Sequence, residues 1–436
     1  MFLPEPILYC INALENAGFA AYAVGGCVRD DCLGLTPHDY DLCTSALPEQ
    51  TEEVFQHHRL ILAGKKHGTV AVVLKGEVVE ITTFRTEGAY GDNRHPDWVA
   101  FVPDVTEDLA RRDFTVNAMA YSPTRGYADP FGGREDLQRG ILRAVRDPRE
   151  RFSEDSLRIL RGIRFASRFR LDIEPETEQA MADMTHLMDN LARERVFEEL
   201  TKMLPTLTAE EVVCFAPILS AVIPELEPLT GFDQRSPHHA YDLLTHTAHV
   251  VAGVDADPAL RWAALLHDIG KVPTFTTDET GRGHFYGHGP KSAEMADAIL
   301  RRLKSPNDLR ERVVLLIDRH MTRPLAEKKF LRRQLSRMGW EAFEQLLQLQ
   351  KADMNSKGVD EPGPDYEAIY ALLREIREEN ACLSLKDLAV NGRDLMALGL
   401  KGKDVGRMLS LLLEEVLEER LPNERCALLA FAEEKS

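Results

Sequence analysis

The 436-residue sequence predicts an α+β fold in which a small mixed β-sheet with its helices comes first and an all-helical remainder follows. Three observations predict this division. Short runs of β-branched residues are confined to the first 140 residues or so, helical spacing of apolar residues dominates from Leu137 onward, and prolines interrupt the helical part at intervals. We therefore expect the sheet to end near residue 140.

The elements of the first part are predicted one after another along the chain. Ile7, Leu8, Ile11 and Leu14 recur at helical spacing up to Gly18, and residues 20–24 are then typical of a short buried strand. A second strand is predicted at 40–43. A hairpin is predicted at 69–84, with its turn at Lys75 and Gly76.

Shifts in composition divide the chain further. Arginines become frequent near residue 140, prolines near 210–235, and glycine with proline near 356–365. These shifts predict four segments, which are a mixed head, an arginine-rich helical neck, a histidine-bearing helical body and a helical tail, at 1–140, 141–210, 211–356 and 357–436.

Composition excludes several classes of protein. Seven cysteines lie far apart without a Cys-x-x-Cys pair, so we expect neither a zinc knuckle nor a disulfide framework, and a reduced cytoplasm fits. The N-terminal region carries Glu5 and Glu15 but no basic stretch, and no run of about 18 apolar residues occurs. The sequence thus predicts no secretion signal and no membrane partner, and it implies no stable protein partner.

The charge of the chain is unevenly distributed. The net charge of −18 argues against a nucleic-acid partner when taken alone. Residues 139–170, however, hold ten arginines against four acidic residues. One basic strip in an acidic protein predicts a docking site for phosphate groups.

Two motifs in the head predict a site for phosphate and metal. Gly25 and Gly26 follow a predicted strand, so backbone N–H groups can approach a phosphate there without interference from a Cβ, although most such turns are structural. If Asp39 and Asp41 lie in a strand, its period of two places both carboxylates on one face. Such a pair suits Mg²⁺, whereas an isolated Asp-x-Asp is more often a solvated turn.

Four motifs together carry a family resemblance. Gly-Gly-x-Val-Arg-Asp at 25–30 is followed by Asp-x-Asp at 39–41, by Arg-Arg-Asp-Phe-Thr-x-Asn-Ala at 111–118 and by Glu-Asp-x-x-Arg at 154–158. In this order they resemble class II CCA-adding enzymes and their poly(A) polymerase relatives, over about residues 1–205. The resemblance implies a magnesium-dependent nucleotidyltransferase that acts on tRNA with CTP and ATP.

The resemblance also assigns roles to individual residues. Asp39 and Asp41 would be the catalytic carboxylates that hold Mg²⁺. Glu80 is a further acidic candidate, which an exposed strand position explains equally well. The triphosphate and ribose of the incoming nucleotide would be bound by a second group, which comprises Gly25, Gly26, Arg29, Arg112 and Asp113.

The fourth motif concerns the choice of base. One helical face is predicted for Arg158, Arg161, Arg164 and Arg168, about one turn after Asp155, and taken alone it fits a solvated or salt-bridged surface. The resemblance implies instead that Asp155 and Arg158 act as a template, supported by Arg161 and Arg164. A carboxylate that accepts and a guanidinium that donates match the amine and ring nitrogen shared by C and A, and disfavour U and G.

Two further stretches bear on where nucleotide addition stops. Residues 85–102 form a long polar segment that resembles the flexible loop of CCA-adding members, which enzymes adding only A often lack. Residues 114–133 are closer to the CCA-adding pattern than to the poly(A) polymerase pattern. Both resemblances favour addition of C, C and A.

A second set of metal-binding residue types lies in the predicted body. His246, His267, Asp268 and Asp353 occur in an order that resembles the HD phosphohydrolase domain, with the adjacent pair at the end of an apolar helix. Imidazoles with carboxylates suit Mn²⁺, Ni²⁺, Fe²⁺ or Mg²⁺, and water at such a site hydrolyses phosphate esters.

Alternatives remain open for this body. His288 and His320 are additional candidate ligands, and Asp318 is a rival to Asp353. A helical core that has lost catalysis is the structural alternative to a working hydrolase.

The sequence therefore predicts a cytoplasmic member of the CCA-adding family whose helical tail binds tRNA. A poly(A) polymerase, or an enzyme that adds only the final A, would share the site. An HD phosphohydrolase whose head only senses nucleotides is the rival from another class, and the paired carboxylates of the head argue against it.

Overall fold

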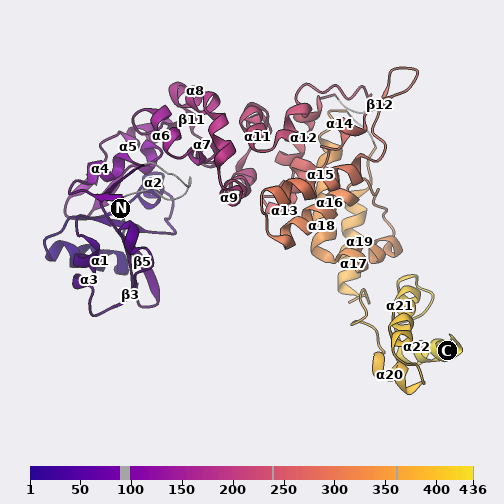
Figure 1. Ribbon diagram of the computed structural model, residues 1–436. Coiled ribbons are helices and arrows are strands. Elements are labelled where there is room, and N and C mark those ends of the chain that lie inside the picture. The colour runs from indigo at the N-terminus through magenta and orange to yellow at the C-terminus, as the bar shows by residue number, and fades with distance from the viewer. Residues whose placement is uncertain (89–98, 238–239, 360–361, 436) are drawn as a thin grey trace. The chain divides into compact units, whose positions relative to one another are not determined.

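The computed structural model describes residues 1–88, 99–237, 240–359 and 362–435 (Figure 1). It contains two compact units, Met1–Glu227 with Arg302–Ser305, and Pro228–Arg301 with Pro306–Ser436. The four predicted segments are a finer division than this, and their boundaries stay predictions. None of the described helices combines the length and apolar character that a membrane crossing requires.

The first unit contains the predicted mixed sheet. Its seven strands lie in the order β3-β4-β5-β2-β1-β8-β9, with β2 and β5 parallel and the other neighbours antiparallel. The strands are β1 Ala21–Val24, β2 Asp41–Thr44, β3 Arg59–Ile61, β4 Thr69–Leu74, β5 Glu77–Thr83, β8 Ala120–Ser122 and β9 Gly126–Ala128.

The first helix and strand form as predicted. Helix α1 (Glu5–Asn16) buries Ile7, Ile11 and Leu14 and contacts β1, β2 and β5, whereas Leu8 of the predicted apolar set is exposed. All four residues of β1 are buried, because α1 covers the sheet there. The second strand, however, begins at Asp41, so Asp39 lies in the preceding loop and the predicted strand pairing of the two carboxylates is wrong in this detail.

The predicted hairpin is confirmed as β4 and β5. Lys75 and Gly76 have φ values of 51° and 91°, the left-handed conformation that a tight two-residue hairpin turn requires. The predicted polar loop at 85–102 begins and ends in paired strands, β6 (Arg85–Glu87) and β7 (Val99–Phe101), and residues 89–98 lie outside the described residues.

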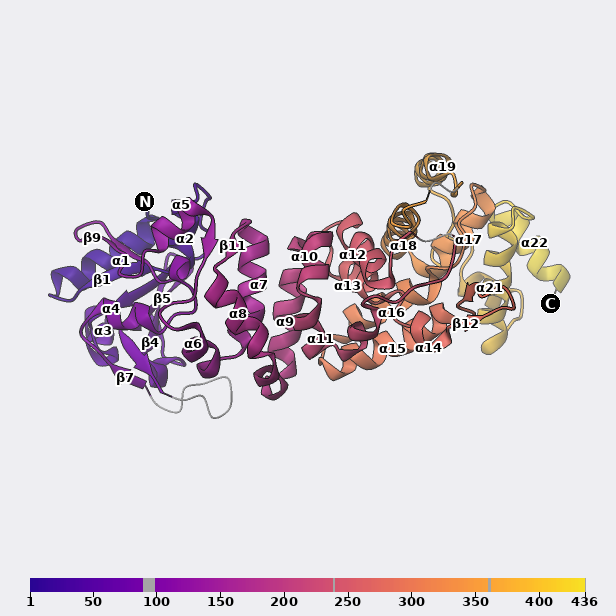
Figure 2. The ribbon, with the colours of Figure 1, turned by 90° about the horizontal axis from the view of Figure 1, so that it is seen from above.

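Helices complete the first unit. In the view of Figure 2, α7 and α9 run side by side, and their residues are in contact. The two-residue strands β10 (Ile141–Leu142) and β11 (Asp172–Ile173) pair in this region, so the part after residue 140 is not entirely helical as predicted. The helices are α2 Gly26–Cys32, α3 Pro48–Val54, α4 Val105–Ala110, α5 Gly133–Arg139, α6 Pro148–Glu154, α7 Leu157–Phe169, α8 Pro175–Asp183, α9 Arg193–Met203, α10 Ala209–Cys214 and α11 Ala216–Val222.

The second unit is mainly helical. Its core is made by α12, α13, α16 and α18, which contact one another around the fully buried Trp262. A short antiparallel pair, β12 (Thr276–Thr277) and β13 (Gly283–His284), adds a further departure from the all-helical prediction. The helices are α12 Leu243–Gly253, α13 Pro258–Leu266, α14 Lys271–Thr274, α15 His288–Arg302, α16 Asn307–Arg319, α17 Lys328–Met338, α18 Trp340–Asn355 and α19 Tyr366–Glu378.

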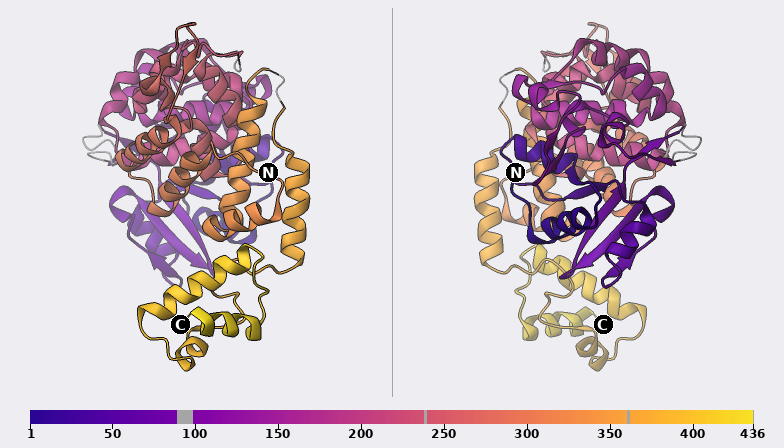
Figure 3. Two further views of the ribbon diagram at one scale, coloured as in Figure 1. Left: turned by 90° about the vertical axis from the view of Figure 1, so that its right-hand side faces the viewer. Right: turned by 90° about the vertical axis from the view of Figure 1, so that its left-hand side faces the viewer.

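The last three helices have a hydrophobic cluster of their own. Leu395, Leu412 and Leu428 are fully buried there, one from each of α20 (Gly392–Ala397), α21 (Lys403–Leu417) and α22 (Arg425–Lys435). Figure 3 shows these helices gathered together at the end of the chain. The C-terminal segment therefore folds around its own core.

Candidate active site

One cavity in the first unit brings together all the residues predicted in the head and neck. Its volume is about 1030 Å³, enough for a nucleotide. The sheet, α2 and α7 all contribute to its walls. The predicted residues that line it are Gly25, Gly26, Arg29, Asp39, Asp41, Glu80, Arg112, Asp113, Asp155, Arg158, Arg161, Arg164 and Arg168.

Register in the sheet explains how three carboxylates reach this cavity. Leu42 of β2 is paired with Ile81 of the parallel strand β5, and both side chains are buried. The preceding residues, Asp41 and Glu80, therefore lie side by side on the opposite, exposed face. Asp39 lines the same cavity from the loop before β2.

The electrostatics of Asp41 reflect this crowding. Partial removal from water raises the pKa of Asp41, the nearby Arg112 guanidinium lowers it, and the charge of Asp39 raises it again, with a net increase. A cation between the two carboxylates would relieve their repulsion. The oxygen-rich cluster suits a hard ion such as Mg²⁺.

The glycine turn is required by its surroundings. Gly25 has φ 76° and ψ −125°, a conformation that residues with a side chain rarely adopt. A Cβ on Gly25 would also lie 2.8 Å from Nη1 of Arg112. The turn thus lets Arg112 lie directly over the start of α2.

Asp113 is held within a buried hydrogen-bond network. Its Oδ2 accepts from Nε of Arg161 at 2.8 Å, and its Oδ1 accepts from Nδ2 of Asn117 at 3.0 Å. Burial raises the pKa of Asp113, but Arg161 and Asn117 outweigh it and hold the pKa well below its usual range. Asp113 thus holds Arg161 in place while it lines the cavity, and its contact with the nucleotide stays a prediction.

Arg29 also forms its contacts within the protein. It donates to Oδ1 of Asn117 at 2.6 Å and to Oδ1 of Asp30. Its guanidinium lies 4.3 Å from the ring centre of Phe169 and 5.3 Å from that of Phe165, both on α7. Arg29 therefore fastens α2 to α7 at the edge of the cavity.

The two predicted template residues, Asp155 and Arg158, are hydrogen-bonded to different partners. Asp155 accepts from Arg195 of α9, with Nη2 at 2.8 Å from Oδ2. Arg158 is buried and donates to Glu154 at 2.7 Å and to the backbone oxygen of Arg111 at 2.8 Å. Both side chains still line the cavity, and their role as a template stays a prediction.

Helix α9 supplies residues that were not predicted from the sequence. Arg195 lines the cavity, and the buried Glu199 accepts from Nε of Arg164 at 2.6 Å. Glu199 also lies 3.8 Å from Nη1 of Arg161. Their spacing of one helical turn was the only sequence signal, and it is too common to identify a site.

The basic strip is less available to phosphate than its charge suggests. Several of its arginines are paired with acidic residues from outside the strip, such as Arg149 with Asp183 and Arg143 with Glu174. The arginines of α7 face the cavity, so the predicted docking site becomes one wall of it.

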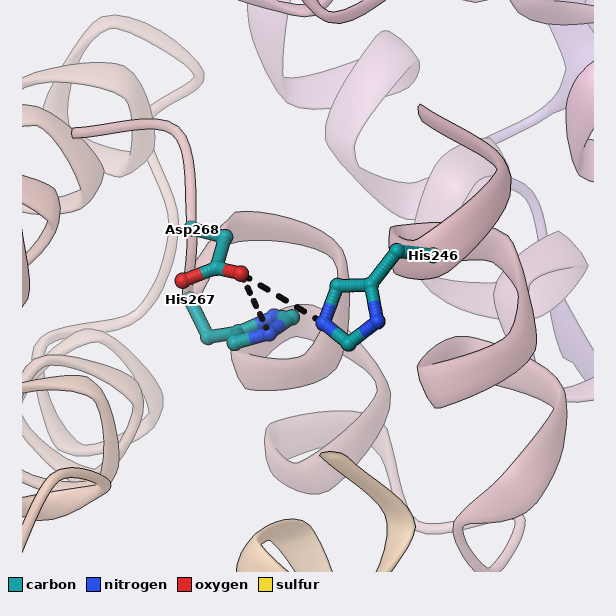
Figure 4. A group of neighbouring side chains, drawn as sticks. All are labelled: His246, His267 and Asp268. Carbon is teal, nitrogen blue, oxygen red and sulfur yellow. Dashed lines mark ion pairs between the residues drawn. The ribbon is translucent and has the colours of Figure 1, made fainter. Parts of the chain in front are cut away.

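The second unit brings the predicted histidine set together. His246 of α12 has its Nε2 3.4 Å from Asp268 and 3.1 Å from Asp353, and Nε2 of His267 is 3.3 Å from Asp268 (Figure 4). The additional candidates join them, with Nε2 of His288 and His320 at 3.5 Å and 3.8 Å from Oδ1 of Asp268.

The rival ligand is placed elsewhere. Asp318 is exposed on α16, where it forms an ion pair with Arg319 at 3.2 Å. Asp353, by contrast, lies beside His246 in the centre. The geometry thus decides between the two aspartates in favour of Asp353.

The four imidazoles share one orientation. Each Nδ1 lies 2.6–3.1 Å from a backbone carbonyl oxygen and donates to it, which directs Nε2 toward the carboxylates. Burial lowers the pKa of His246, but Asp268 and Asp353 outweigh it and raise the pKa to about 9. Among the described residues, Nε2 of His267, His288 and His320 has no hydrogen-bond partner although it is buried. Buried lone pairs aimed at one carboxylate fit a bound metal ion.

Charges in this centre agree with such a role. Burial raises the pKa of Asp268, but His267 and Lys271 outweigh it and hold the pKa well below its usual range. Burial and the neighbouring His267 lower the pKa of His320 to about 4, so its ring is neutral near pH 7. Ligand atoms fall into two overlapping groups, His246 with His267 and Asp268, and Asp268 with His288 and His320.

Three stretches of this chain match the models of known protein domains. The poly(A) polymerase head domain matches residues 21–143, the RNA- and SrmB-binding site of polymerase A matches 170–213, and tRNA nucleotidyltransferase domain 2 matches 289–432. A CCA-adding enzyme of Bacillus velezensis is 33% identical over 420 residues, which cover 95% of this chain and 94% of that protein. The chain belongs to the family of CCA-adding enzymes.

Other CCA-adding enzymes support the same assignment. That of Streptococcus mutans is 34% identical over 433 residues, with 98% of this chain and 96% of the relative covered. The crystal structure of the Bacillus stearothermophilus CCA-adding enzyme in complex with CTP superposes with a TM-score of 0.74 and 29% identity, over 99% of this chain and 98% of that one. This chain is therefore a nucleotidyltransferase with the α+β fold of that family.

More distant members share the fold. The Thermotoga maritima CCA-adding enzyme complexed with tRNA has a TM-score of 0.61 at 20% identity, over 99% of this chain and 94% of that one. The prediction of family and fold class is thereby confirmed.

Proposed function

We propose that this CCA-adding enzyme adds C, C and A to the 3′ end of tRNA from CTP and ATP, with Mg²⁺ held by Asp39, Asp41 and Glu80. The juxtaposition of these three carboxylates in the cavity that α7 lines is the observation that carries the proposal. Relatives have been described in complex with CTP and with tRNA, which supports the same ligands here. A cytoplasmic location is in keeping with seven free thiols.

The reaction joins the terminal ribose to the α-phosphorus of the nucleotide. The 3′-hydroxyl loses its proton to solvent as its oxygen bonds to the α-phosphorus. The bond from the α-phosphorus to the bridging oxygen breaks, and pyrophosphate leaves. When bound, Mg²⁺ would supply activation of the hydroxyl and charge stabilisation for the leaving group. Arg112 lies over the glycine turn, where its positive charge attracts the triphosphate.

Choice of base is assigned to Asp155 and Arg158. Asp155 accepts from the exocyclic amine of C or A, and Arg158 donates to the adjacent ring nitrogen. Uracil and guanine place a carbonyl oxygen against Asp155, and that repulsion disfavours both. The hydrogen bond from Arg195 orients the carboxylate.

One experiment tests the proposal directly. Purified protein is incubated with tRNA that ends at the discriminator base, with CTP and ATP together and separately, and the 3′ ends are sequenced. Ends carrying C, C and A with both nucleotides, and only C residues with CTP alone, are expected. Addition of A to tRNA that lacks both C residues would favour a poly(A) polymerase. No addition to this tRNA, with addition of A to tRNA that already ends in C, C, would favour the enzyme that adds only the final A.

We further propose that the second unit is a metal-dependent phosphohydrolase of the HD type. Four imidazoles that each have Nδ1 hydrogen-bonded to a backbone carbonyl and Nε2 directed at Asp268 are the observation that favours it. A transition metal such as Mn²⁺ or Ni²⁺ fits this mixture of nitrogen and carboxylate ligands, and when bound it would supply an activated water. The ionised Asp268 holds Lys271 at 2.7 Å, which places a positive charge beside the phosphate.

Hydrolysis of a phosphate ester at this site exchanges one bond to phosphorus for another. The oxygen of water bonds to phosphorus, the ester bond from phosphorus to oxygen breaks, and a proton from water goes to the leaving oxygen. Elemental analysis of protein purified with added Mn²⁺ or Ni²⁺, together with release of inorganic phosphate, tests it. Protein that holds neither metal and releases no phosphate would favour a core without catalysis.

A further inference from the structure

The histidine centre opens into a cavity that lies entirely within the second unit. Its volume is about 290 Å³, and Asp268, His288 and Asp353 form one side of it. Segment 282–286, which contains β13, forms another side. This volume is at the lower end for small-ligand sites, so the cavity accommodates part of one small molecule and no folded polymer.

An aromatic pair is part of the lining of this cavity. The rings of His284 and Tyr286 are stacked, with centres 5.3 Å apart and planes inclined by 6°. Tyr286 is 80% exposed, although large aromatic side chains bury much apolar surface when covered. One face of the tyrosine ring is therefore backed by His284, and the remaining surface is open to a planar partner.

The pair is held in place by its neighbours. Nε2 of His284 is hydrogen-bonded to Oδ2 of Asp278 at 2.9 Å, which fixes the histidine ring. Phe285, between the two stacked residues, packs against Phe275 with ring centres 5.5 Å apart. Gly283, just before the pair, packs closely against the backbone of Gln234, because a Cβ on Gly283 would lie only 2.3 Å from the backbone oxygen of Gln234.

Positive side chains line the same cavity. Arg282, Lys271 and Lys357 all contribute to its walls. Lys271 is already bonded to Gln234 at 2.9 Å, so its ammonium is fixed beside Asp268. The cavity thus combines basic side chains, beside the carboxylates of the histidine centre, with an exposed aromatic ring.

We infer that Tyr286, backed by His284, is a stacking platform for the base of a nucleotide whose phosphate ester lies at the histidine centre. The inference rests on the proposed phosphohydrolase and adds its substrate class, a nucleoside monophosphate. Stacking tolerates any base, because each has a π-face, so the platform distinguishes nucleotides from base-free esters rather than one base from another.

Two esters that differ only in the base test this platform. Adenosine 5′-monophosphate and ribose 5-phosphate carry the same phosphate on the same sugar carbon. Release of inorganic phosphate from each is measured as kcat/KM for the full-length protein loaded with Mn²⁺, for Tyr286→Ala and for Tyr286→Trp. We expect Tyr286→Ala to lower the preference for the nucleotide about tenfold or more, and Tyr286→Trp to keep it.

A matched control comes from another tyrosine and histidine pair. Tyr9 on α1 is hydrogen-bonded to His58 at 3.3 Å, with ring centres 5.5 Å apart, and lines neither proposed active site. Tyr9→Ala should leave the preference for the nucleotide unchanged. A preference that also survives Tyr286→Ala, or an equal loss for both esters, would overturn the platform.

Binding provides a readout that does not depend on turnover. Equilibrium dialysis of labelled adenosine 5′-monophosphate compares the wild-type protein with Tyr286→Ala, and binding in the first unit is common to both. Weaker binding by the variant supports the platform, and equal binding contradicts it. If the wild-type protein hydrolyses neither ester, the phosphohydrolase proposal fails, whereas the dialysis result still decides on the platform.

Discussion

Arg195 and Asp155 form an ion pair in which Nη2 lies 2.8 Å from Oδ2, although 40 residues separate them in the sequence. Arg158, only three residues from Asp155, is held instead by Glu154 and by the backbone of Arg111. The two members of the proposed template are thus positioned by different parts of the first unit. Substitutions should therefore affect the acceptor and the donor separately.

Asp155→Ala tests the acceptor. It removes the partner of the amines of C and A together with the repulsion against a carbonyl, so use of CTP and ATP should fall while relative use of UTP rises. Single-turnover incorporation of each of the four nucleotides on one tRNA primer measures the ratios. Ratios equal to those of the wild-type protein would place base choice outside Asp155.

Arg195→Ala tests whether orientation of the carboxylate matters. Asp155 remains, but it loses the guanidinium that fixes it, so incorporation of CTP and ATP should fall about 10–100-fold, the usual scale for supporting contacts. Arg195→Lys keeps the charge and should recover part of the loss. A fall in folding stability without any change in nucleotide ratios or rates would mean that the pair is only structural.

Substitutions on two strands, β2 and β5, test metal binding in the first unit. Asp41→Ala should abolish nucleotide addition while the fold is retained. The two carboxylates that remain, Asp39 and Glu80, are not enough to hold Mg²⁺ in place for the reaction. Glu80→Gln should lower the rate, whereas Glu77→Gln, an exposed carboxylate on the same strand outside the cavity, should not. Rates are measured over a range of Mg²⁺ concentrations, and circular dichroism checks folding. Full activity of folded Asp41→Ala protein would refute the metal assignment.

Much of the fold was predictable because local signals agree with the final packing. Ile7, Ile11 and Leu14 form the buried side of α1, and the hairpin turn lies at Lys75 and Gly76, as their spacing indicates. The start of β2 was missed by one residue, because periodicity alone does not fix where pairing with a neighbouring strand begins. Asp39 lies before the first paired residue of β2, so it reaches the cavity from a loop.

The site was predictable only as far as its motifs extend. Arg195 and Glu199 lie outside every motif, and their importance depends on α9 packing against α7, a contact between distant segments. The contact of Asp113 with the nucleotide stays a prediction, whereas the hydrogen bonds that its oxygens accept from Arg161 and Asn117 were not predictable from the motif. Sequence order shows which residue types are present, whereas hydrogen-bond partners depend on the tertiary fold.

The histidine centre is tested by removing two ligands at once. His267→Ala with Asp268→Ala should eliminate bound Mn²⁺ or Ni²⁺ and any phosphohydrolase activity, because Asp268 belongs to both groups of ligand atoms. Nucleotide addition should be nearly unchanged, since its proposed residues lie in the other unit. Asp318→Ala, at the exposed rival position, is the matched control and should retain the metal. Elemental analysis gives the metal content, and loss of metal from the control would contradict the choice of Asp353.

Acid should weaken the first unit through Asp113. Its pKa is held below the ordinary carboxyl value of about 4 by Arg161 and Asn117, so the unfolded chain binds a proton more readily than the folded one. The stabilisation is therefore complete above that ordinary value and is lost as pH falls through it toward the lower folded pKa. Asp113→Asn removes one partner of a buried pair and should cost about 3–5 kcal/mol near neutral pH. Urea unfolding of both proteins should show that this difference shrinks steadily below about pH 4, because the other carboxyl groups titrate alike in both proteins. A difference that stays constant down to about pH 2 would mean that Asp113 acts through packing and hydrogen bonds rather than through its charge.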